Sequence, residues 1–415
     1  MTSLHFNYKD VFRAGRLGFS PKKMWIVFLG FLIGYAGYDI LTYLAYMTAG
    51  IQIGDIWQTY RLMPMFPSPM DGQWPVYSWI IWAVGALWWL IVALLVGVAV
   101  SKVTYEQLKG DEFYEIKDAI KFALKNGKAA LMAPFVLILF IAALLVMGIF
   151  LALCTLIPYF GLLFFAVMSI PAFAVCLFIL YLAVVVLVSL IIGPAIVGAT
   201  GNDTFDTLFE SFSVINDQPW RFITYQALLL VVIVIGVAIL AFFSAKAIFL
   251  CKAVVGLIVP ADKLDTVFMN ASYYVKLVIP DYYPIAIQDP IVNFIRDTLG
   301  MPNLLYPMEY LIPPGSESWA SAIASFLLGI VYYFIVMFVS SLACSIYWAG
   351  NTVIFTVLVK KKDDKNLLEI KEETFEEKPA EVEPAAPEKP EEKKKGKKKK
   401  DDEKEEPKPE AKSDV

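Results

Sequence analysis

Six stretches of the sequence are too long and too apolar to belong to the interior of a soluble domain. A helix that crosses a bilayer needs about 20 mostly apolar residues. The runs that meet this requirement are 24–47, 76–100, 129–157, 162–192, 222–245 and 321–359. Because 58% of all residues are hydrophobic, the bilayer is the expected solvent. The sequence therefore predicts an all-α membrane protein with about six transmembrane helices. We expect a kink in the fourth at Pro171, and we expect the last to project past the membrane or to break near Gly350 and Asn351.

Charged residues divide the chain into three regions. Residues 360–415 hold 17 of the 35 Lys and Arg residues and 19 of the 39 Asp and Glu residues, and a segment of this composition cannot bury a core. We therefore expect a charged, largely disordered tail after a transmembrane domain at 24–359, and a basic amphipathic segment at 1–23 before it. Within the transmembrane domain, the segment 251–320 is not a simple loop, since residues 289–300 are typical of a capped amphipathic helix.

The expected orientation follows from the distribution of Lys and Arg, which concentrate in cytoplasmic segments of membrane proteins. Residues 1–23 carry five basic residues and residues 101–128 carry six, whereas 48–75 holds only Arg61. With six spans, this pattern places both termini in the cytoplasm and the segment 251–320 outside.

Residues 201–226 (GNDTFDTLFESFSVINDQPWRFITYQ) interrupt the apolar runs with the pattern of an amphipathic helix. Asn202 or Asp203 can cap this helix, and Pro219 is expected to end it or to open the next one. We expect it to lie in the membrane–water interface as a short elbow helix that leads into the fifth span. Its expected anchors are Phe205, Leu208, Phe209, Phe212, Trp220 and Arg221. Its polar face is expected to hold Asp206, Glu210, Ser213 and Asn216.

The same pattern occurs upstream, which indicates an internal repeat. Phe113 in the segment 111–132 corresponds to Phe205, and residues 7–25 offer a weaker copy. The chain then consists of three units, each an elbow helix followed by a helical hairpin, and internal duplication of this kind is common in membrane folds. The alternative is that loops between two spans tend to be amphipathic in any case.

The run GPAIVGATGNDTFDTLFESFSVINDQPWRFITY (193–225) places a proline before a polar turn, then a D-T-F-D-x-L-x-x-S-F-S helix and Pro-Trp-Arg-Phe. The motif positions are Pro194, Asp203, Thr204, Phe205, Asp206, Thr207, Leu208, Ser211, Phe212, Ser213, Pro219, Trp220, Arg221 and Phe222. This pattern resembles a bacterial family of multi-pass membrane proteins of uncharacterised function. The segment 345–364 looks like the closing segment of the same family, with Lys-Lys-Lys-Asp at 360–363 where the family usually has Arg-Arg-Asp. The resemblance covers these two segments closely and the six-span layout loosely. It implies the architecture and a bacterial inner membrane, and it implies no activity.

Asp39 is the candidate polar site inside the membrane. It is the only acidic residue in the six apolar runs, and a carboxylate there is costly unless it is paired. It lies toward the outer end of the first run, where Tyr35, Tyr38, Tyr43 and Tyr46 could donate hydrogen bonds. Both a structural role and a proton or cation site are consistent with this pattern.

No residue pattern indicates catalysis, a cofactor or a metal site. The only histidine is His5, and none of the four cysteines belongs to a CxxC pair, so zinc and disulfide frameworks are not expected. The sequence lacks the phosphate-binding, serine-hydrolase and zinc-protease motifs. The basic run 393–400 is flanked by acidic blocks that largely neutralise it beyond a Debye length of about 8 Å, so no nucleic-acid partner is expected.

These observations favour a non-enzymatic membrane scaffold or accessory subunit. Its expected partners are the lipid bilayer and other membrane proteins or a second copy of the chain. One alternative, motivated by Asp39, is a transporter or channel for a small or amphipathic solute. Another, motivated by the elbow helices, is a role in lipid handling or envelope homeostasis.

Overall fold

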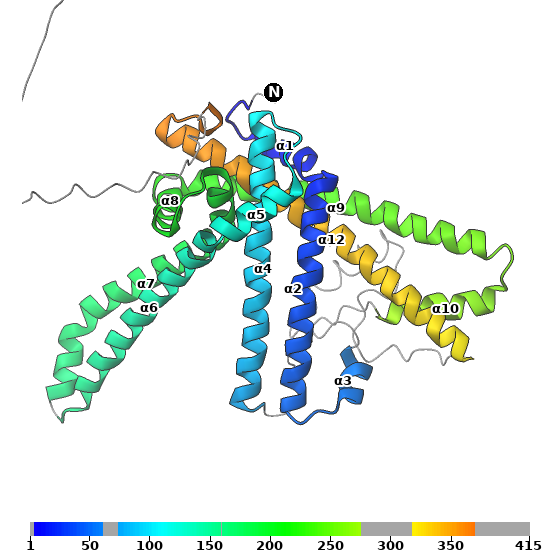
Figure 1. Cartoon of the computed structure of the whole chain (residues 1–415). Helices are drawn as coiled ribbons and strands as arrows, with labels where there is room; N and C mark the ends of the chain where they lie inside the picture. Colours follow the sequence, from blue (N-terminus) through cyan, green and yellow to red (C-terminus); the bar gives the residue numbers. More distant parts are fainter. Residues whose placement is uncertain (1–3, 61–73, 159, 275–317, 370–415) are drawn as a thin grey trace, which may run out of the picture. The chain divides into compact units, whose positions relative to one another are not determined.

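The computed structural model describes residues 4–60, 74–158, 160–274 and 318–369, and every regular element in these ranges is a helix. Six helices are long and apolar enough to cross a membrane. They are α2 (Pro21–Thr48), α4 (Val76–Lys109), α6 (Lys128–Leu153), α7 (Phe160–Thr200), α9 (Pro219–Val255) and α12 (Trp319–Asp363) (Figure 1). The predicted all-α membrane fold is therefore confirmed. The helix expected at 289–300 and residues 370–415 of the expected tail lie outside the described residues.

Several of the long helices continue beyond the apolar runs that predicted them. α4 extends to Lys109 and α7 to Thr200, and α7 runs through Pro171 and Pro194 as a single helix. α12 is also continuous through Gly350 and Asn351. The expectation that the last apolar run breaks at these residues is therefore wrong. Pro219 opens α9 at its first turn, a position where the missing N–H of proline costs nothing.

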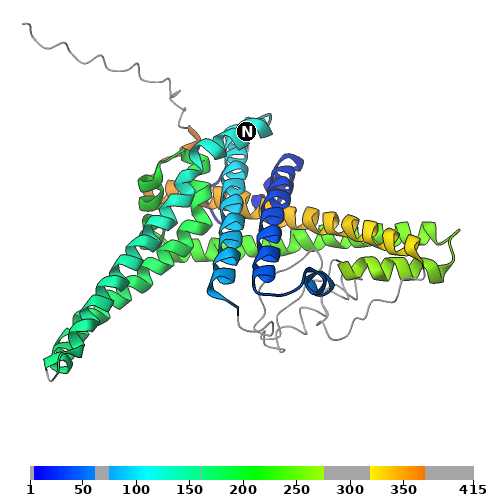
Figure 2. The same cartoon turned by 60° about the horizontal axis from the view of Figure 1, so that its bottom comes forward.

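The same order of elements occurs three times along the chain. A short helix precedes each pair of long helices: α1 (Lys9–Gly18) precedes α2 and α4, α5 (Ile116–Asn126) precedes α6 and α7, and α8 (Thr204–Asp217) precedes α9 and α12. The two long helices of each unit pack against each other, as α6 and α7 do in both views (Figure 2). Two further helices, α3 (Ile53–Tyr60) and α10 (Ala261–Tyr274), lie in the connections of the first and third hairpins. This order is the one expected from the three elbow patterns.

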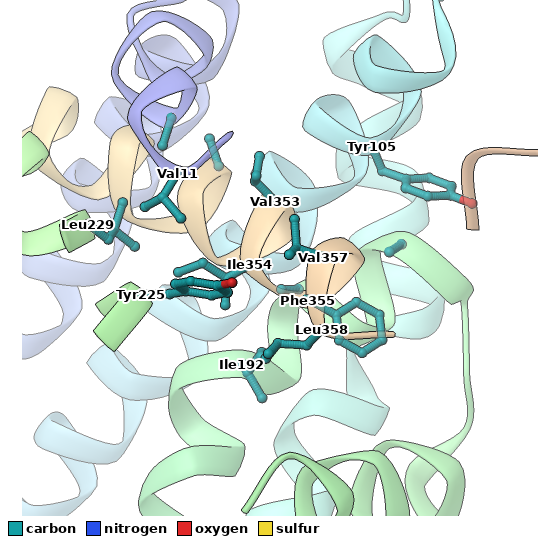
Figure 3. Packing of buried hydrophobic residues seen from close by; sticks show 14 of the residues in the cluster. Val11, Tyr105, Ile192, Tyr225, Leu229, Val353, Ile354, Phe355, Val357 and Leu358 are labelled. Atoms are coloured by element: carbon teal, nitrogen blue, oxygen red, sulfur yellow. The ribbon is translucent and has the colours of Figure 1, made fainter. Parts of the chain in front are cut away.

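The hydrophobic core lies near one end of the long helices. Its largest cluster joins Val11 of α1, Ile192 of α7, Leu229 of α9 and Phe355 of α12 (Figure 3). Every residue of α12 from position 348 to 359 is buried, and α12 contacts α1, α2, α4, α7 and α9. A helix enclosed on all sides must be apolar around its whole circumference, or its polar side chains must form hydrogen bonds within the protein. We call this region, at the C-terminal end of α12, the base of the protein.

Small residues allow the helices of the base to approach closely. A side chain at Gly97 of α4 would place its first carbon 2.8 Å from the indole ring of Trp348 in α12. A side chain at Gly18 would meet the backbone of Ile346 at 2.5 Å. Such close approaches maximise dispersion contacts, which stabilise helix pairs where the surroundings are apolar.

The hairpin of α6 and α7 is much less covered than the base. All buried residues of α6 lie between positions 129 and 137, although the helix continues to Leu153. In α7, Gly161 is the only buried residue before Leu182. The outer parts of both helices therefore expose apolar side chains that the described chain does not cover.

Candidate functional site

Asp39 lies where α2 meets α4 and α12. Tyr35 precedes it by one helical turn, and the hydroxyl groups of Tyr35 and Tyr333 of α12 are hydrogen-bonded. Their ring centroids are 5.8 Å apart. The hydroxyl group of Tyr38 accepts a hydrogen bond of 3.1 Å from the indole N–H of Trp82 in α4. Tyr35 and Tyr38 flank Asp39 on α2, and Tyr333 of α12 packs on Tyr35, so polar aromatic side chains lie beside this carboxylate.

One oxygen of the Asp39 carboxylate is unsatisfied within the described part of the chain. Its Oδ1 atom is buried and has no hydrogen-bond partner among the residues that the structure describes. A buried oxygen without a donor is costly, and a proton or a cation would relieve this cost. Tyr35 and Tyr38 lie near Asp39, but neither donates to its Oδ1 atom, and Tyr46 packs on Trp74 with ring centroids 4.7 Å apart.

The elbow helix α8 is capped as the sequence indicates. The Oδ1 atom of Asp203 accepts a hydrogen bond of 3.0 Å from the backbone N–H of Asp206. This contact satisfies one of the free donors at the start of the helix. The helix contacts α6, α7 and α9, so it lies against the second and third hairpins.

The predicted anchors of α8 do not form a single stripe. Leu208 is buried, and Phe212 packs on the ring of Tyr181 in α7 with centroids 6.0 Å apart. Phe205 and Phe209 point away from the protein and are 63% and 65% exposed. The reason is that the helix buries its small and hydroxyl-bearing side at Thr207 and Ser211, together with Val214. Phe205 and Phe209 lie on the other side of the helix and therefore face outward.

The two remaining anchors lie at the start of α9. Trp220 is 79% exposed, as expected for a side chain at the membrane–water boundary. Arg221 is also exposed, and its Nη1 atom donates to Oε1 of Gln218 at 3.2 Å. Gln218 in turn donates from Nε2 to the backbone oxygen of Leu358 at 3.2 Å. Arg221 therefore belongs to a polar chain that links the start of α9 to the base.

The acidic face of α8 is not as open as its sequence suggests. Glu210 is half-buried, and burial raises the pKa of this carboxyl although the nearby Lys362 opposes the shift. Asp217 lies 3.8 Å from the ammonium group of Lys362 at the end of α12. The polar face of α8 is therefore partly covered at Glu210, because the last turn of α12 lies beside it.

Polar pairs inside the base are the contacts that sequence reasoning missed. Gln226 of α9 donates from Nε2 to Oδ1 of the fully buried Asn351 at 2.5 Å. Lys23, also fully buried, donates to the backbone oxygen of Leu17 and to Oε1 of Gln107, each at 2.8 Å. The available signal was the presence of the uncharged polar residues Gln226 and Asn351 within apolar runs.

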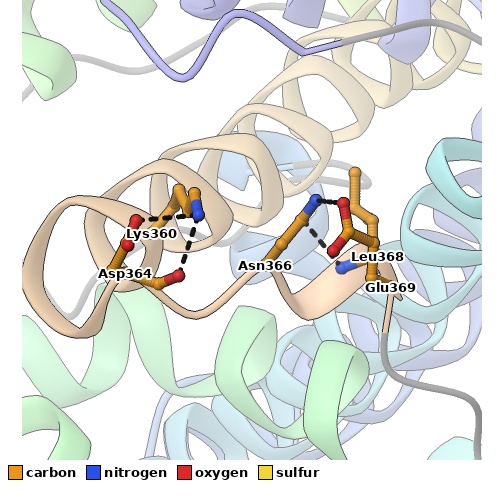
Figure 4. Close-up of polar contacts among 5 residues, drawn as sticks. All are labelled: Lys360, Asp364, Asn366, Leu368 and Glu369. Carbon is orange, nitrogen blue, oxygen red and sulfur yellow. Dashed lines mark hydrogen bonds and ion pairs between the residues drawn. The ribbon is translucent and has the colours of Figure 1, made fainter.

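The chain leaves the base through a short, well-bonded segment. The ammonium group of Lys360 contacts the backbone oxygen and Oδ1 of Asp364, each at 2.8 Å (Figure 4). This contact lowers the pKa of Asp364. The side-chain amide of Asn366 donates to Glu369 at 2.7 Å, and the hydroxyl group of Tyr105 donates to the backbone oxygen of Leu367 at 2.7 Å. The contact from Tyr105 ties this exit segment to α4.

Comparisons of the chain with protein-family models, with curated proteins and with solved structures find no match. Among the described residues, no group of three or more His, Cys, Asp or Glu side chains is placed to hold a metal ion. The function is therefore argued from the contacts of the chain itself.

Proposed function

We propose that this chain is a non-enzymatic scaffold or accessory subunit of a bacterial inner membrane, with both termini in the cytoplasm. The orientation is supported by the basic segments at 1–23 and 101–128, because basic residues concentrate on the cytoplasmic side. The bacterial origin and the inner membrane rest on the resemblance of 193–225 to a bacterial membrane protein family. In this arrangement the base lies at the cytoplasmic face.

The uneven covering of the hairpin of α6 and α7 carries this proposal. Its base ends are buried, whereas Phe150 near the outer end of α6 and Phe173 in α7 are among the many exposed apolar side chains. The hairpin is thus anchored at one end and presents its length to the bilayer or to a partner helix. A hairpin anchored in this way can hold a neighbouring membrane protein, because helices in a membrane associate through close packing.

The polar groups inside the base also favour a structural role. A transport path is lined by polar groups that are available to the solute. Here Gln226 and Asn351 bond to each other, and Gln218 bonds to the backbone of α12. Side chains that satisfy one another hold helices together and are not offered to a solute.

A photo-crosslinking experiment in cells tests the scaffold proposal. A benzophenone amino acid replaces Phe150 or Phe173 in the exposed hairpin, and Ile192 or Phe355 in the base as matched buried controls. We expect a discrete protein adduct at the hairpin positions and only internal products at the controls. Adducts with lipid alone at both hairpin positions would contradict the scaffold proposal.

Asp39 supports a second candidate, a transporter for protons or small cations. The specific observation is the buried Oδ1 atom without a hydrogen-bond partner among the described residues. Purified protein in liposomes would be assayed for proton and potassium flux with enclosed fluorescent indicators. Flux that is present in the unmodified protein and lost in Asp39→Asn would favour transport. An absence of flux in both would leave the scaffold proposal standing.

A further inference from the structure

The elbow helix α5 carries a row of lysines that its counterpart α8 lacks. Lys117, Lys121 and Lys125 recur along α5, and Lys128 follows as the first residue of α6. Lys117, Lys121 and Lys125 share one face of α5, because residues four apart lie on the same side of a helix. All four lysine side chains are exposed. We call these four residues the α5 lysine row. In the same place of the repeated unit, α8 holds three acidic residues and no Lys or Arg.

Packing on the opposite side of α5 fixes the direction of the row. Ala119 and Ala123 are buried in a cluster with Val98 of α4, so the lysines cannot turn toward the protein. The segment before α5 is held by Lys22, which donates to the backbone oxygen of Glu112 at 3.1 Å. Within the part of the chain that the structure describes, none of the four lysines forms an ion pair. The row therefore faces outward, and its charges are not compensated by ion pairs.

Exposed apolar side chains place the row at the edge of the hydrocarbon. Ile120 and Leu124 lie beside the lysines and are 37% and 68% exposed. Lys128 begins α6, and exposed apolar side chains follow it on the same face of that helix: Met132, Phe135 and Leu139. In a spanning helix these side chains face acyl chains, so Lys128 lies where the headgroups begin.

We propose that the α5 lysine row binds the phosphate groups of anionic phospholipids in the leaflet at the base of the protein. The lysine ammonium is a compact charge with three donors, which suits a phosphodiester. An amphipathic helix with lysines beside exposed apolar side chains binds an anionic membrane surface in two ways. The apolar side chains are buried among acyl chains, and the lysines are attracted to the phosphate groups. The acidic α8 cannot do the same, so anionic lipid gathers beside α5 and the hairpin that follows it. This binding does not depend on whether the hairpin also contacts a partner protein.

The test compares two variants that lose the same charge at the same end of the full-length protein. The row variant is Lys117→Gln/Lys121→Gln/Lys125→Gln. The control variant is Lys9→Gln/Lys361→Gln/Lys365→Gln, whose three lysines are exposed but do not share a helix face. Protein in neutral detergent is titrated with phosphatidylglycerol or phosphatidylcholine, and bound lipid is counted by native mass spectrometry.

We expect the unmodified protein to prefer phosphatidylglycerol, and the row variant to lose this preference. Each lysine near a lipid surface contributes about a fivefold factor, so three acting independently give a loss of roughly 100-fold. The control variant should change affinity by at most about fivefold. Equal weakening in both variants, or none in either, would overturn the proposal.

Two further measurements use the unmodified protein and therefore do not depend on the folding of a variant. Raising the salt concentration should weaken phosphatidylglycerol binding and leave phosphatidylcholine binding unchanged, because only the first is ionic. Free glycerol phosphate should not displace the lipid at millimolar concentration, since it lacks the acyl chains that Ile120 and Leu124 contact. A lipid signal that ignores salt, or that free glycerol phosphate removes, would also overturn the proposal.

Discussion

Phe355→Ala should destabilise the protein far more than Phe338→Ala, although both residues belong to α12. Phe355 is 1% exposed within the cluster that joins four helices at the base, whereas Phe338 is 46% exposed. Replacing a core phenylalanine by alanine costs about 3–5 kcal/mol, of which part is transfer and part is the cavity left behind. Where the unfolded helices remain in detergent, the transfer part shrinks and the loss of packing dominates. We therefore expect the lower end of that range, about 3 kcal/mol, for Phe355→Ala.

The same change at Phe338 removes contacts with detergent or lipid and should stay within about 0.5 kcal/mol. The two variants would be unfolded by adding SDS to the protein in a mild detergent, with helix content followed by circular dichroism. A difference of 3 kcal/mol corresponds to about a hundredfold change in the folding equilibrium. Equal losses for the two variants would refute the conclusion that the core lies at the base.

The remaining predictions concern close packing, a titrating group and orientation. Gly97→Val should cost about 1–3 kcal/mol, because its first side-chain carbon would lie 2.8 Å from an indole carbon of α12, whereas Gly148→Val, with open space around it, should be neutral in the same unfolding assay. The raised pKa of Glu210 means that the folded state binds this proton more tightly than the unfolded state. The contribution of this group is therefore most favourable below its ordinary pKa of about 4.5 and is lost as the pH rises through the folded pKa. Unfolding curves of Glu210→Gln should lack this part of the pH dependence, and curves of unchanged slope would contradict it. In a background without native cysteines, a membrane-impermeant thiol reagent added to intact cells should label Asp262→Cys and not Lys117→Cys, and the reverse result would contradict the proposed orientation.

The spans and elbow helices could be predicted because their signals are local. A run of apolar residues identifies a spanning helix from the solvent that it requires, and the cap at Asp203 needs only its own neighbours. The ends of the helices were harder to predict from the sequence. α4 continues past its apolar run as far as Lys109, because the polar residues of its last turns are enclosed by the base. Tyr105, for example, is buried and donates to the exit segment.

Contacts between distant segments could not be predicted from the pattern. Tyr333 reaches the neighbourhood of Asp39 only because α12 packs on α2, and nothing in either sequence segment specifies that pairing. The division of the α8 anchors has a similar cause. The helical spacing of apolar residues alone places Leu208 and Phe209 on one apolar stripe. In the structure, however, α6 and α7 cover only one side of the helix. Burial then separates two residues that are adjacent in sequence.

The three elbow helices share a position in the repeated unit and differ in what surrounds them. α1 is drawn into the core, where Val11 and Ala14 are fully buried. α5 is covered on one side only and turns a lysine row outward. α8 places Asp217 beside Lys362 and so contacts the end of α12. The hairpins meet at one base, so each elbow helix can contact different surroundings without disturbing the other two. The three copies thus differ, since one closes the core, one turns lysines outward and one contacts the end of α12. This division supports the scaffold role that we propose over a symmetric path through the membrane.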